Sequence, residues 1–215
     1  MNKAIGSKIA DYLIKPVNPN QVLLSIKKNV HSQQLVTEQT TADYRSEFGR
    51  ISSQLQMADS FADWCSLYRK LTTWEIELSE SNDQSIHEVL TYQKSEANQE
   101  FSKFVRRNYY NWINRRDEQS PVMSHMLMRS NIFPVVDENP KTTLMLIDNF
   151  RYDQWRSISS LLRGYYDVAL DDFYCAILPT ATQYARNAIF AGLMPLAIDK
   201  LMPNKWLNDN EEGGK

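Results

Sequence analysis

The residues best suited to chemistry lie in the last third of the chain, where an acidic residue and two threonines stand at the ends of apolar segments. Asp148 follows an apolar run, and Thr180 and Thr182 stand where a helical pattern begins. A carboxylate is a hard oxygen ligand for a divalent metal, and a bound metal lowers the pKa of a neighbouring hydroxyl. The resulting alkoxide can attack phosphorus, provided that both residues are present. A threonine at a helix start by itself more often only caps the helix.

The segment that positions the threonines is residues 179–195, which predicts a turn followed by a short helix. Pro179 and Pro195 stand at its two ends, and Gly192 marks the point where the helix stops. The first N–H groups of a helix have no partners within the helix, and the helix dipole favours negative charge there. A hydroxyl at such a helix start can touch a phosphate that the backbone already holds.

The segments that surround this helix predict an α/β fold. Residues 142–147 form a continuous apolar run, which is typical of a strand that is buried on both faces in a parallel sheet. Residues 150–162 have helical spacing, and residues 168–178 contain strand-like pieces. Ligands of such sheets bind at the carboxyl ends of the strands, where Asp148 and Thr182 both fall.

The middle of the chain, residues 29–117, predicts helices and shows no strand alternation. Apolar residues recur at three- and four-residue steps over residues 48–71 and again over residues 86–113. A polar break over residues 79–85 separates them, and Ser85 opens a capping-box pattern. We expect three helices that form a small bundle and connect two flanking domains.

The chain starts with a short apolar segment, residues 10–17, that predicts a strand ending in a Lys-Pro pair. Asn18 and Pro19 follow, as an N-cap and a proline at the first helical position. These residues resemble the last strand and last helix of a CheY-like receiver domain. The resemblance implies that Lys15 pairs with the phosphoryl group on an aspartate, whose added charge a lysine can neutralise. That aspartate would precede Met1, so we expect the chain to begin part-way through a receiver.

Two later segments, residues 146–155 and 179–195, resemble the PglZ domain of the alkaline phosphatase superfamily. The superfamily pattern is a strand ending in Asp-x-Phe/Leu-Arg, a nucleophilic Thr or Ser, and a helix that closes with small-Gly-hydrophobic-x-Pro. Counting back from the closing Gly-Leu-Met-Pro puts the nucleophile at Thr182, with Thr180 as the alternative. The resemblance implies a divalent metal, of the zinc type, with Asp148 as one ligand and Thr182 reaching the same ion.

Arg186 is the candidate for binding the substrate phosphate, although it could equally pair with an acidic side chain. The superfamily's metal site needs further Asp and His ligands. The three histidines, His31, His87 and His125, all precede Asp148, and we expect them to be surface or packing residues. We therefore expect the 215-residue chain by itself to lack a complete metal site and to be inactive.

The order of receiver end, helical connector and PglZ-like segment resembles the PorX-type response regulators. We expect a receiver remnant over residues 1–30, the connector over 31–120 and the N-terminal portion of a PglZ domain over 141–215. The resemblance implies regulation of type IX secretion, hydrolysis of oligonucleotide phosphodiesters, and two partners: a sensor histidine kinase and an extracytoplasmic-function sigma factor. Whether the protein forms a homodimer stays open. The alternative is a non-catalytic signalling adaptor that binds the sigma factor or a nucleotide through its PglZ-like domain.

Composition excludes several other classes of protein. Hydrophobic residues make up 42% of the 215 residues and charged residues 23%, as in globular domains. The formal net charge of −2 argues against non-specific binding of nucleic acid. Cys65 and Cys175 fit neither a disulfide framework nor a zinc motif. No apolar run approaches the length of a membrane span, so we expect a soluble, cytoplasmic protein.

Overall fold

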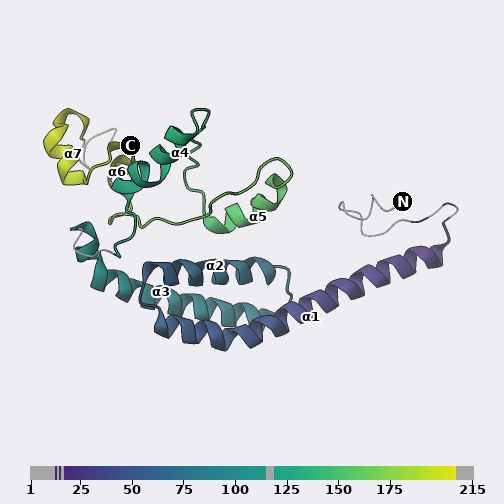
Figure 1. Ribbon diagram of the computed structural model, residues 1–215. Helices are drawn as coiled ribbons and strands as arrows, with labels where there is room; N and C mark the ends of the chain where they lie inside the picture. The colour runs from purple at the N-terminus through teal and green to yellow at the C-terminus, as the bar shows by residue number, and fades with distance from the viewer. Residues whose placement is uncertain (1–12, 14, 16, 115–118, 207–215) are drawn as a thin grey trace. The chain divides into compact units, whose positions relative to one another are not determined.

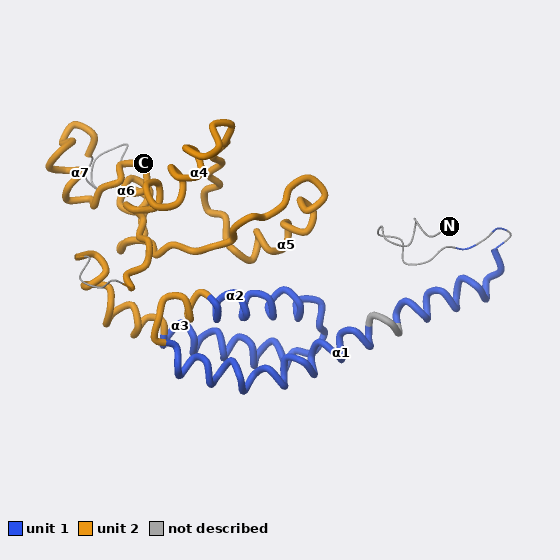
Figure 2. The backbone as a smooth tube through the Cα atoms, in the orientation of Figure 1, with its two compact units in different colours: residues 1–58, 66–100 blue, residues 59–65, 101–215 orange. Residues whose placement is uncertain are grey.

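The computed structural model describes residues 13, 15, 17–114 and 119–206, and their regular elements are helices (Figure 1). In chain order these are α1 (Pro19–Met57), α2 (Phe61–Glu77), α3 (Gln84–Ile113), the 3-10 helix η1 (Ser124–Met126), the π-helix η2 (Met128–Ile132), α4 (Phe133–Glu138), α5 (Tyr152–Leu162), α6 (Thr182–Ala191), α7 (Pro195–Leu201) and the 3-10 helix η3 (Pro203–Lys205). The chain divides into two compact units, residues 1–58 with 66–100 and residues 59–65 with 101–215 (Figure 2).

The α/β class predicted from the sequence is wrong for the described residues, which are helical and contain no strand. Residues 142–147 are extended without a ladder partner, and four of their apolar side chains are at least half exposed. A strand needs neighbouring strands to pair its N–H and C=O groups, and the described residues supply none. Residues 168–178 contribute only an isolated parallel bridge between Met123 and Cys175. The receiver strand expected over residues 10–17 lies largely outside the described residues.

The helices predicted from apolar periodicity are confirmed. Three helices occupy the middle of the chain, α5 covers most of the segment expected to be helical after Asp148, and α6 ends where Gly192 predicts. Helical periodicity depends only on residues that are close in sequence, so the helices are predicted correctly where the pairing of strands is not. Within the described residues, every helix is too short or too polar to cross a bilayer.

α1 begins at the predicted N-cap. The Asn18 carboxamide oxygen accepts the N–H of Asn20 at 2.9 Å, and the Gln21 side-chain oxygen accepts the N–H of Asn18 at 3.3 Å. Pro19 occupies the first helical position, where its missing N–H costs nothing. The helix then continues unbroken for 39 residues. It therefore runs through residue 30, the predicted end of the receiver remnant.

In the first unit, α1 packs beside the parts of α2 and α3 that belong to that unit (Figure 2). The ring of Tyr44 lies 5.3 Å from that of Trp74, centroid to centroid, and both helices bury apolar side chains. Burial of one such side chain stabilises the fold by about 1.5–3 kcal/mol. The buried apolar residues of this unit include Tyr44, Ile51, Leu55, Leu67, Leu71, Leu78, Ile86 and Leu90.

A single fully buried amide fixes the register of α3 against α1. The Gln93 side-chain nitrogen donates to the carbonyl oxygen of Phe48 at 3.0 Å and to the hydroxyl of Ser52 at 3.1 Å. Its side-chain oxygen accepts the hydroxyl of Tyr44 at 3.0 Å. All three partners belong to α1, so a slip of α3 by one residue would leave several buried polar groups unpaired.

The turn that precedes α3 is capped by a residue other than the predicted one. The helix begins before Ser85, and the Asp83 carboxylate accepts both the N–H of Ser85, at 3.0 Å, and its hydroxyl, at 2.6 Å. The hydrogen bond from the Ser85 side chain lowers the pKa of Asp83. A carboxylate serves well here because the start of a helix favours negative charge.

In the second unit, aromatic rings join the start of α2 to the end of α3. Trp64 lies 5.4 Å from Phe101 and 5.9 Å from Phe104, centroid to centroid. Trp112 lies 5.4 Å from Phe104 and 6.2 Å from Phe61. Such tilted and edge-to-face pairs contribute packing beyond their buried area. This aromatic cluster therefore packs the last part of α3 against the start of α2 within the second unit.

Candidate functional site

The threonines that the sequence singles out lie at the start of α6, and both are exposed. Thr182 is the first residue of the helix, and Ala181 occupies the N-cap without a side-chain hydrogen bond. Neither Thr182 nor Thr180 therefore caps the helix, so both hydroxyls stay available at the surface. At the other end, Gly192 has a φ of 64° and donates its N–H to the Ala188 carbonyl oxygen at 3.0 Å, as the predicted helix stop requires.

The first turn of α6 offers backbone donors to an anion. The N–H groups of Tyr184 and Ala185 donate to the Ala181 carbonyl oxygen at 3.0 and 2.9 Å. Those of Thr182 and Gln183 have no acceptor among the described hydrogen bonds. Two donors at the positive end of a ten-residue helix are suited to oxygens of a phosphate.

Asp148 and Arg186 meet beside this helix start. An Arg186 guanidinium nitrogen lies 4.0 Å from an Asp148 carboxylate oxygen, and the two side chains are 36% and 80% exposed. Arg186 follows Thr182 by four residues, so the two lie on the same face of α6. Asp148 also accepts the N–H of Asn149 at 3.0 Å, in a turn where Asn149 has a φ of 53°. Arg186 thus lies within ion-pair distance of Asp148, and whether it binds a phosphate or pairs with this carboxylate stays a prediction.

Arg151, the other arginine of the motif, is engaged elsewhere. It donates two hydrogen bonds to the Asp153 carboxylate, at 3.0 and 2.9 Å, and its N–H donates to the Gln154 side-chain oxygen at 2.9 Å. The hydrogen bond from the Arg151 side chain lowers the pKa of Asp153. Arg151 therefore organises the start of α5 and leaves Arg186 as the better candidate for a phosphate.

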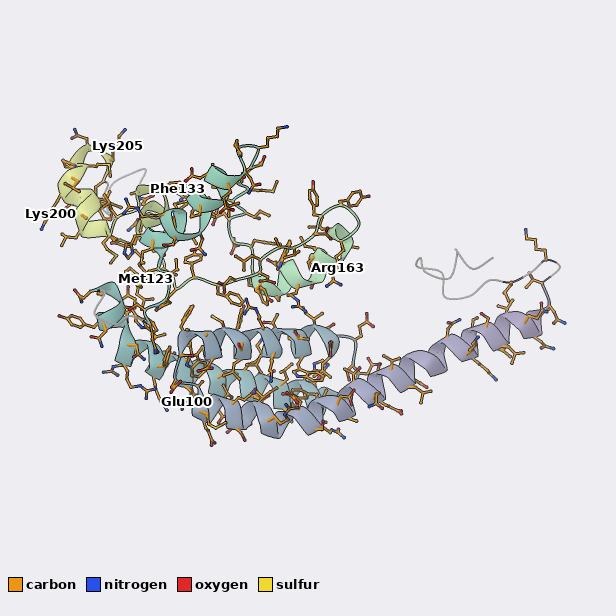
Figure 3. The ribbon with its side chains drawn as sticks, in the orientation of Figure 1. Glu100, Met123, Phe133, Arg163, Lys200 and Lys205 are labelled. Carbon is orange, nitrogen blue, oxygen red and sulfur yellow. The ribbon has the colours of Figure 1, made fainter. Side chains whose placement is uncertain are left out.

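The chain just before α6 is anchored by residues that were not predicted to belong to the site. Cys175 pairs with the segment around the fully buried Met123, which is labelled in Figure 3. The hydroxyl of Tyr109, on α3, accepts the N–H of Leu178 at 2.6 Å. Tyr109 lies in a run of aromatic residues of helical spacing, so nothing in the local sequence distinguishes it from its neighbours. Its partner is 69 residues away, and only the fold brings the two together.

The described residues do not complete the metal site that the resemblance to the alkaline phosphatase superfamily implies. Asp148 and Thr182 offer one carboxylate and one hydroxyl, whereas a catalytic zinc site takes three protein ligands. Among the described residues, no group of three or more His, Cys, Asp or Glu side chains could hold a metal. Burial also raises the pKa of the Cys175 thiol to about 11, so that this thiol is a poor metal ligand at neutral pH.

The remaining candidates lie away from this helix start or outside what the structure describes. His87 is within 2.8 Å of the Ser81 carbonyl oxygen, as expected of a packing residue. His31 lies within α1, and its side chain is not described. Lys15 is exposed, and most residues of the strand expected around it are outside the described ranges. Its part in a receiver switch stays a prediction.

Two family models match the chain. A model of the PorX response regulator linker domain matches residues 34–113, and a model of the BREX system PglZ alkaline phosphatase-like domain matches residues 127–215. The two matches support a PorX-type protein. No curated protein matches the chain.

The PorX-type matches agree with the order of segments predicted from the sequence. The linker match begins within α1 and ends with α3, so it contains Gln93 and Tyr109. The PglZ match contains Asp148, Thr182 and Arg186, which places the candidate site in an alkaline phosphatase-like domain. The two matches fit a response-regulator-related protein with an alkaline phosphatase-like domain, and the PglZ match suggests a metal-dependent family. The domain boundaries drawn from the sequence stay predictions.

Proposed function

We propose that this PorX-type protein hydrolyses phosphodiesters of the oligonucleotide type, with Thr182 as the nucleophile of its PglZ domain. The observation that carries the proposal is the approach of Arg186 to Asp148, 4.0 Å apart, on the face of α6 that begins with Thr182. The match to an alkaline phosphatase-like domain over residues 127–215 supports the same reaction class.

The residues divide the work between binding and attack. Arg186 binds two non-bridging oxygens of the phosphodiester through its planar guanidinium. The N–H groups of Thr182 and Gln183 bind a further oxygen at the helix start. The pair between Arg186 and Asp148 is long and largely exposed, so it contributes little to stability and gives way to a phosphate at small cost.

In the proposed reaction, the Thr182 hydroxyl oxygen forms a bond to phosphorus, and the bond from phosphorus to one ester oxygen breaks. The hydroxyl proton is lost, the departing oxygen gains a proton, and one part of the oligonucleotide leaves as an alcohol. Water then attacks the phosphorus of this threonine phosphodiester, and the bond from phosphorus to the Thr182 oxygen breaks. The Thr182 oxygen regains a proton, and the rest of the oligonucleotide leaves as a phosphomonoester. A zinc-type ion with Asp148 and Thr182 among its ligands needs further ligands beyond those the structure describes.

The regulatory part of the proposal has the linker match as its support. In it, a sensor histidine kinase phosphorylates the receiver, Lys15 pairs with the phosphoryl group, and the protein contacts an extracytoplasmic-function sigma factor to regulate type IX secretion. The second candidate function is an adaptor that binds the sigma factor or a nucleotide without turnover.

The test is hydrolysis of a short oligonucleotide by the full-length gene product in the presence of Zn²⁺. We expect Thr182→Ala to lower the rate on the order of a thousandfold or more, because it removes the nucleophile. Thr180→Ala is the matched control, since it removes the same group two residues earlier, and we expect it to keep the rate within about threefold. If Thr180→Ala lost activity and Thr182→Ala kept it, the nucleophile would be Thr180 and not Thr182. No hydrolysis by the wild type, with retained binding of the sigma factor, would favour the adaptor.

A further inference from the structure

One side chain of the linker holds both backbone polar groups of a residue that lies just before the candidate nucleophile. The N–H of Leu178 donates to the hydroxyl oxygen of Tyr109 at 2.6 Å, and the same hydroxyl donates to the Leu178 carbonyl oxygen at 3.4 Å. A phenol can do both because it carries one donor and two acceptor lone pairs. Tyr109 lies on α3, within the linker match, and Leu178 lies in the PglZ match.

Two residues just before Leu178, Cys175 and Ile177, are also held by hydrogen bonds. The N–H of Cys175 donates to the Val122 carbonyl oxygen at 2.8 Å, and the N–H of Ser124 donates to the Cys175 carbonyl oxygen at 3.2 Å. The N–H of Ile177 donates to the hydroxyl of Ser124 at 3.1 Å, and both of these residues are fully buried. The bond from Leu178 to Tyr109 is the last in this row of hydrogen bonds before the helix.

Beyond Leu178 the chain has little to hold it until α6 begins. Residues 179–182 are exposed, and no hydrogen bond of their side chains is found in the described part of the chain. Only three residues separate Leu178 from Thr182, so the position of Leu178 limits where the helix can start. Burial raises the pKa of Tyr109, so its phenol stays protonated at neutral pH and can donate as well as accept.

We propose that Tyr109 is a positioning residue for the Thr182 nucleophile, and that the linker helix α3 thereby holds part of the PglZ site in place. This inference rests on the proposed function, because only a reacting hydroxyl needs a fixed position. Removing the phenol oxygen would leave the N–H and C=O of Leu178 without their partner. The segment from Leu178 to Thr182 would then sample more positions, while the upstream bonds to Val122 and Ser124 would remain.

The anchoring is tested on the 215-residue chain by amide hydrogen exchange, with Tyr109→Phe as the variant. We expect the exchange of the Leu178 amide to become about five- to tenfold faster, the effect of losing one neutral hydrogen bond. The amide of Ile177, which has its own acceptor in Ser124, should change less than twofold. The adjacent Tyr110→Phe is the matched control, because Tyr110 is 60% exposed and the same atom is removed. Unchanged exchange at Leu178, or an equal effect in Tyr110→Phe, would overturn the proposal.

The effect on Thr182 is tested by its methyl signal in NMR spectra and by kinetics. We expect Tyr109→Phe, and not Tyr110→Phe, to shift or broaden the Thr182 methyl signal. In the full-length gene product we expect kcat to fall about tenfold with KM nearly unchanged, since the substrate still meets Arg186. An unmoved methyl signal, or an unchanged kcat in an active enzyme, would refute positioning. If the wild type shows no hydrolysis, the proposed function fails by itself, and the exchange and methyl measurements still decide the role of Tyr109.

Discussion

The fully buried Gln93 makes a sharp test of how the helices of the first unit are held together. Gln93→Glu exchanges its NH₂ group for an oxygen without changing the size of the side chain. The new oxygen would face the Phe48 carbonyl oxygen, which now accepts a hydrogen bond at 3.0 Å. At neutral pH the variant would bury a negative charge and place a carboxylate oxygen next to the Phe48 carbonyl oxygen. Few single substitutions lower the stability of a fold more than this.

The magnitude follows from the bonds that change. The Tyr44 hydroxyl still donates to one carboxylate oxygen, and the Ser52 hydroxyl, which now accepts from the amide at 3.1 Å, can rotate to donate to the other. The bond to Phe48 is lost and its carbonyl oxygen is left unpaired, which costs about 1–3 kcal/mol for a neutral group and more beside a charge. We therefore expect Gln93→Glu to lower the free energy of unfolding by about 3 kcal/mol or more at pH 7. That is a large part of the stability of an ordinary domain.

The same variant carries a prediction of pH dependence. Burial and the facing Phe48 carbonyl oxygen raise the pKa of the new carboxyl above its ordinary value of about 4.3. A raised pKa means that the protonated form is favoured in the folded state, so the deficit shrinks as pH falls through the folded-state pKa. It returns as pH rises again. Once protonated, the carboxyl donates to Phe48 much as the amide does.

The assay is urea unfolding of the 215-residue chain followed by circular dichroism at pH 7 and pH 4. Gln99→Glu is the matched control, because it makes the same charge change on α3 at an exposed position. We expect this control to stay within about 0.5 kcal/mol of the wild type. Equal effects of Gln93→Glu and Gln99→Glu would refute the structural role of Gln93. A deficit that does not shrink at pH 4 would refute its assignment to a buried charge.

Two further predictions concern a buried phenol and a left-handed glycine. Burial raises the pKa of Tyr44 to about 12, so its contribution to stability is intact below pH 10 and is lost as pH rises toward 12. The full loss is about 3 kcal/mol, from about 1.4 kcal/mol per pKa unit. As pH rises above 10, the free energy of unfolding in urea should therefore fall faster for the wild type than for Tyr44→Phe. Parallel plots of this free energy against pH would contradict the prediction. Gly192 has a φ of 64° and room for a methyl group, with the nearest atom 3.8 Å away. Gly192→Ala should lower the free energy of unfolding by about 1–2 kcal/mol through backbone strain alone. Gly164→Ala, where the added methyl group meets open space, is the control and should be nearly neutral in the same measurement. Equal unfolding midpoints for the two variants would count against the backbone explanation.

The helices and their ends are the part of this protein that its sequence determines. Asn18 caps α1, and Gly192 ends α6, at the residues that the pattern indicates. Caps and stops depend on side chains within three or four residues, so the local sequence carries the necessary information. The order of a connector and a PglZ-like segment is also carried by local motifs, and the family matches agree with it.

The strands are the part that local sequence could not decide. An apolar run such as residues 142–147 has the composition of a buried strand, yet pairing depends on other strands that no local pattern reports. Among the described residues the run finds no partner, and its apolar side chains are largely exposed. The physical reason is that a strand satisfies its backbone groups outside itself, whereas a helix satisfies them within.

The candidate site combines both kinds of information. The sequence by itself determined that Thr182 starts a helix and that Asp148 follows an apolar run. Only the tertiary structure brought Asp148 to Arg186, and Tyr109 to Leu178 across 69 residues. Contacts of this length depend on how α3 and the chain before α6 pack, because no spacing rule links residues so far apart. The residues that could react are thus readable from the sequence, and the residues that hold them are readable only from the fold.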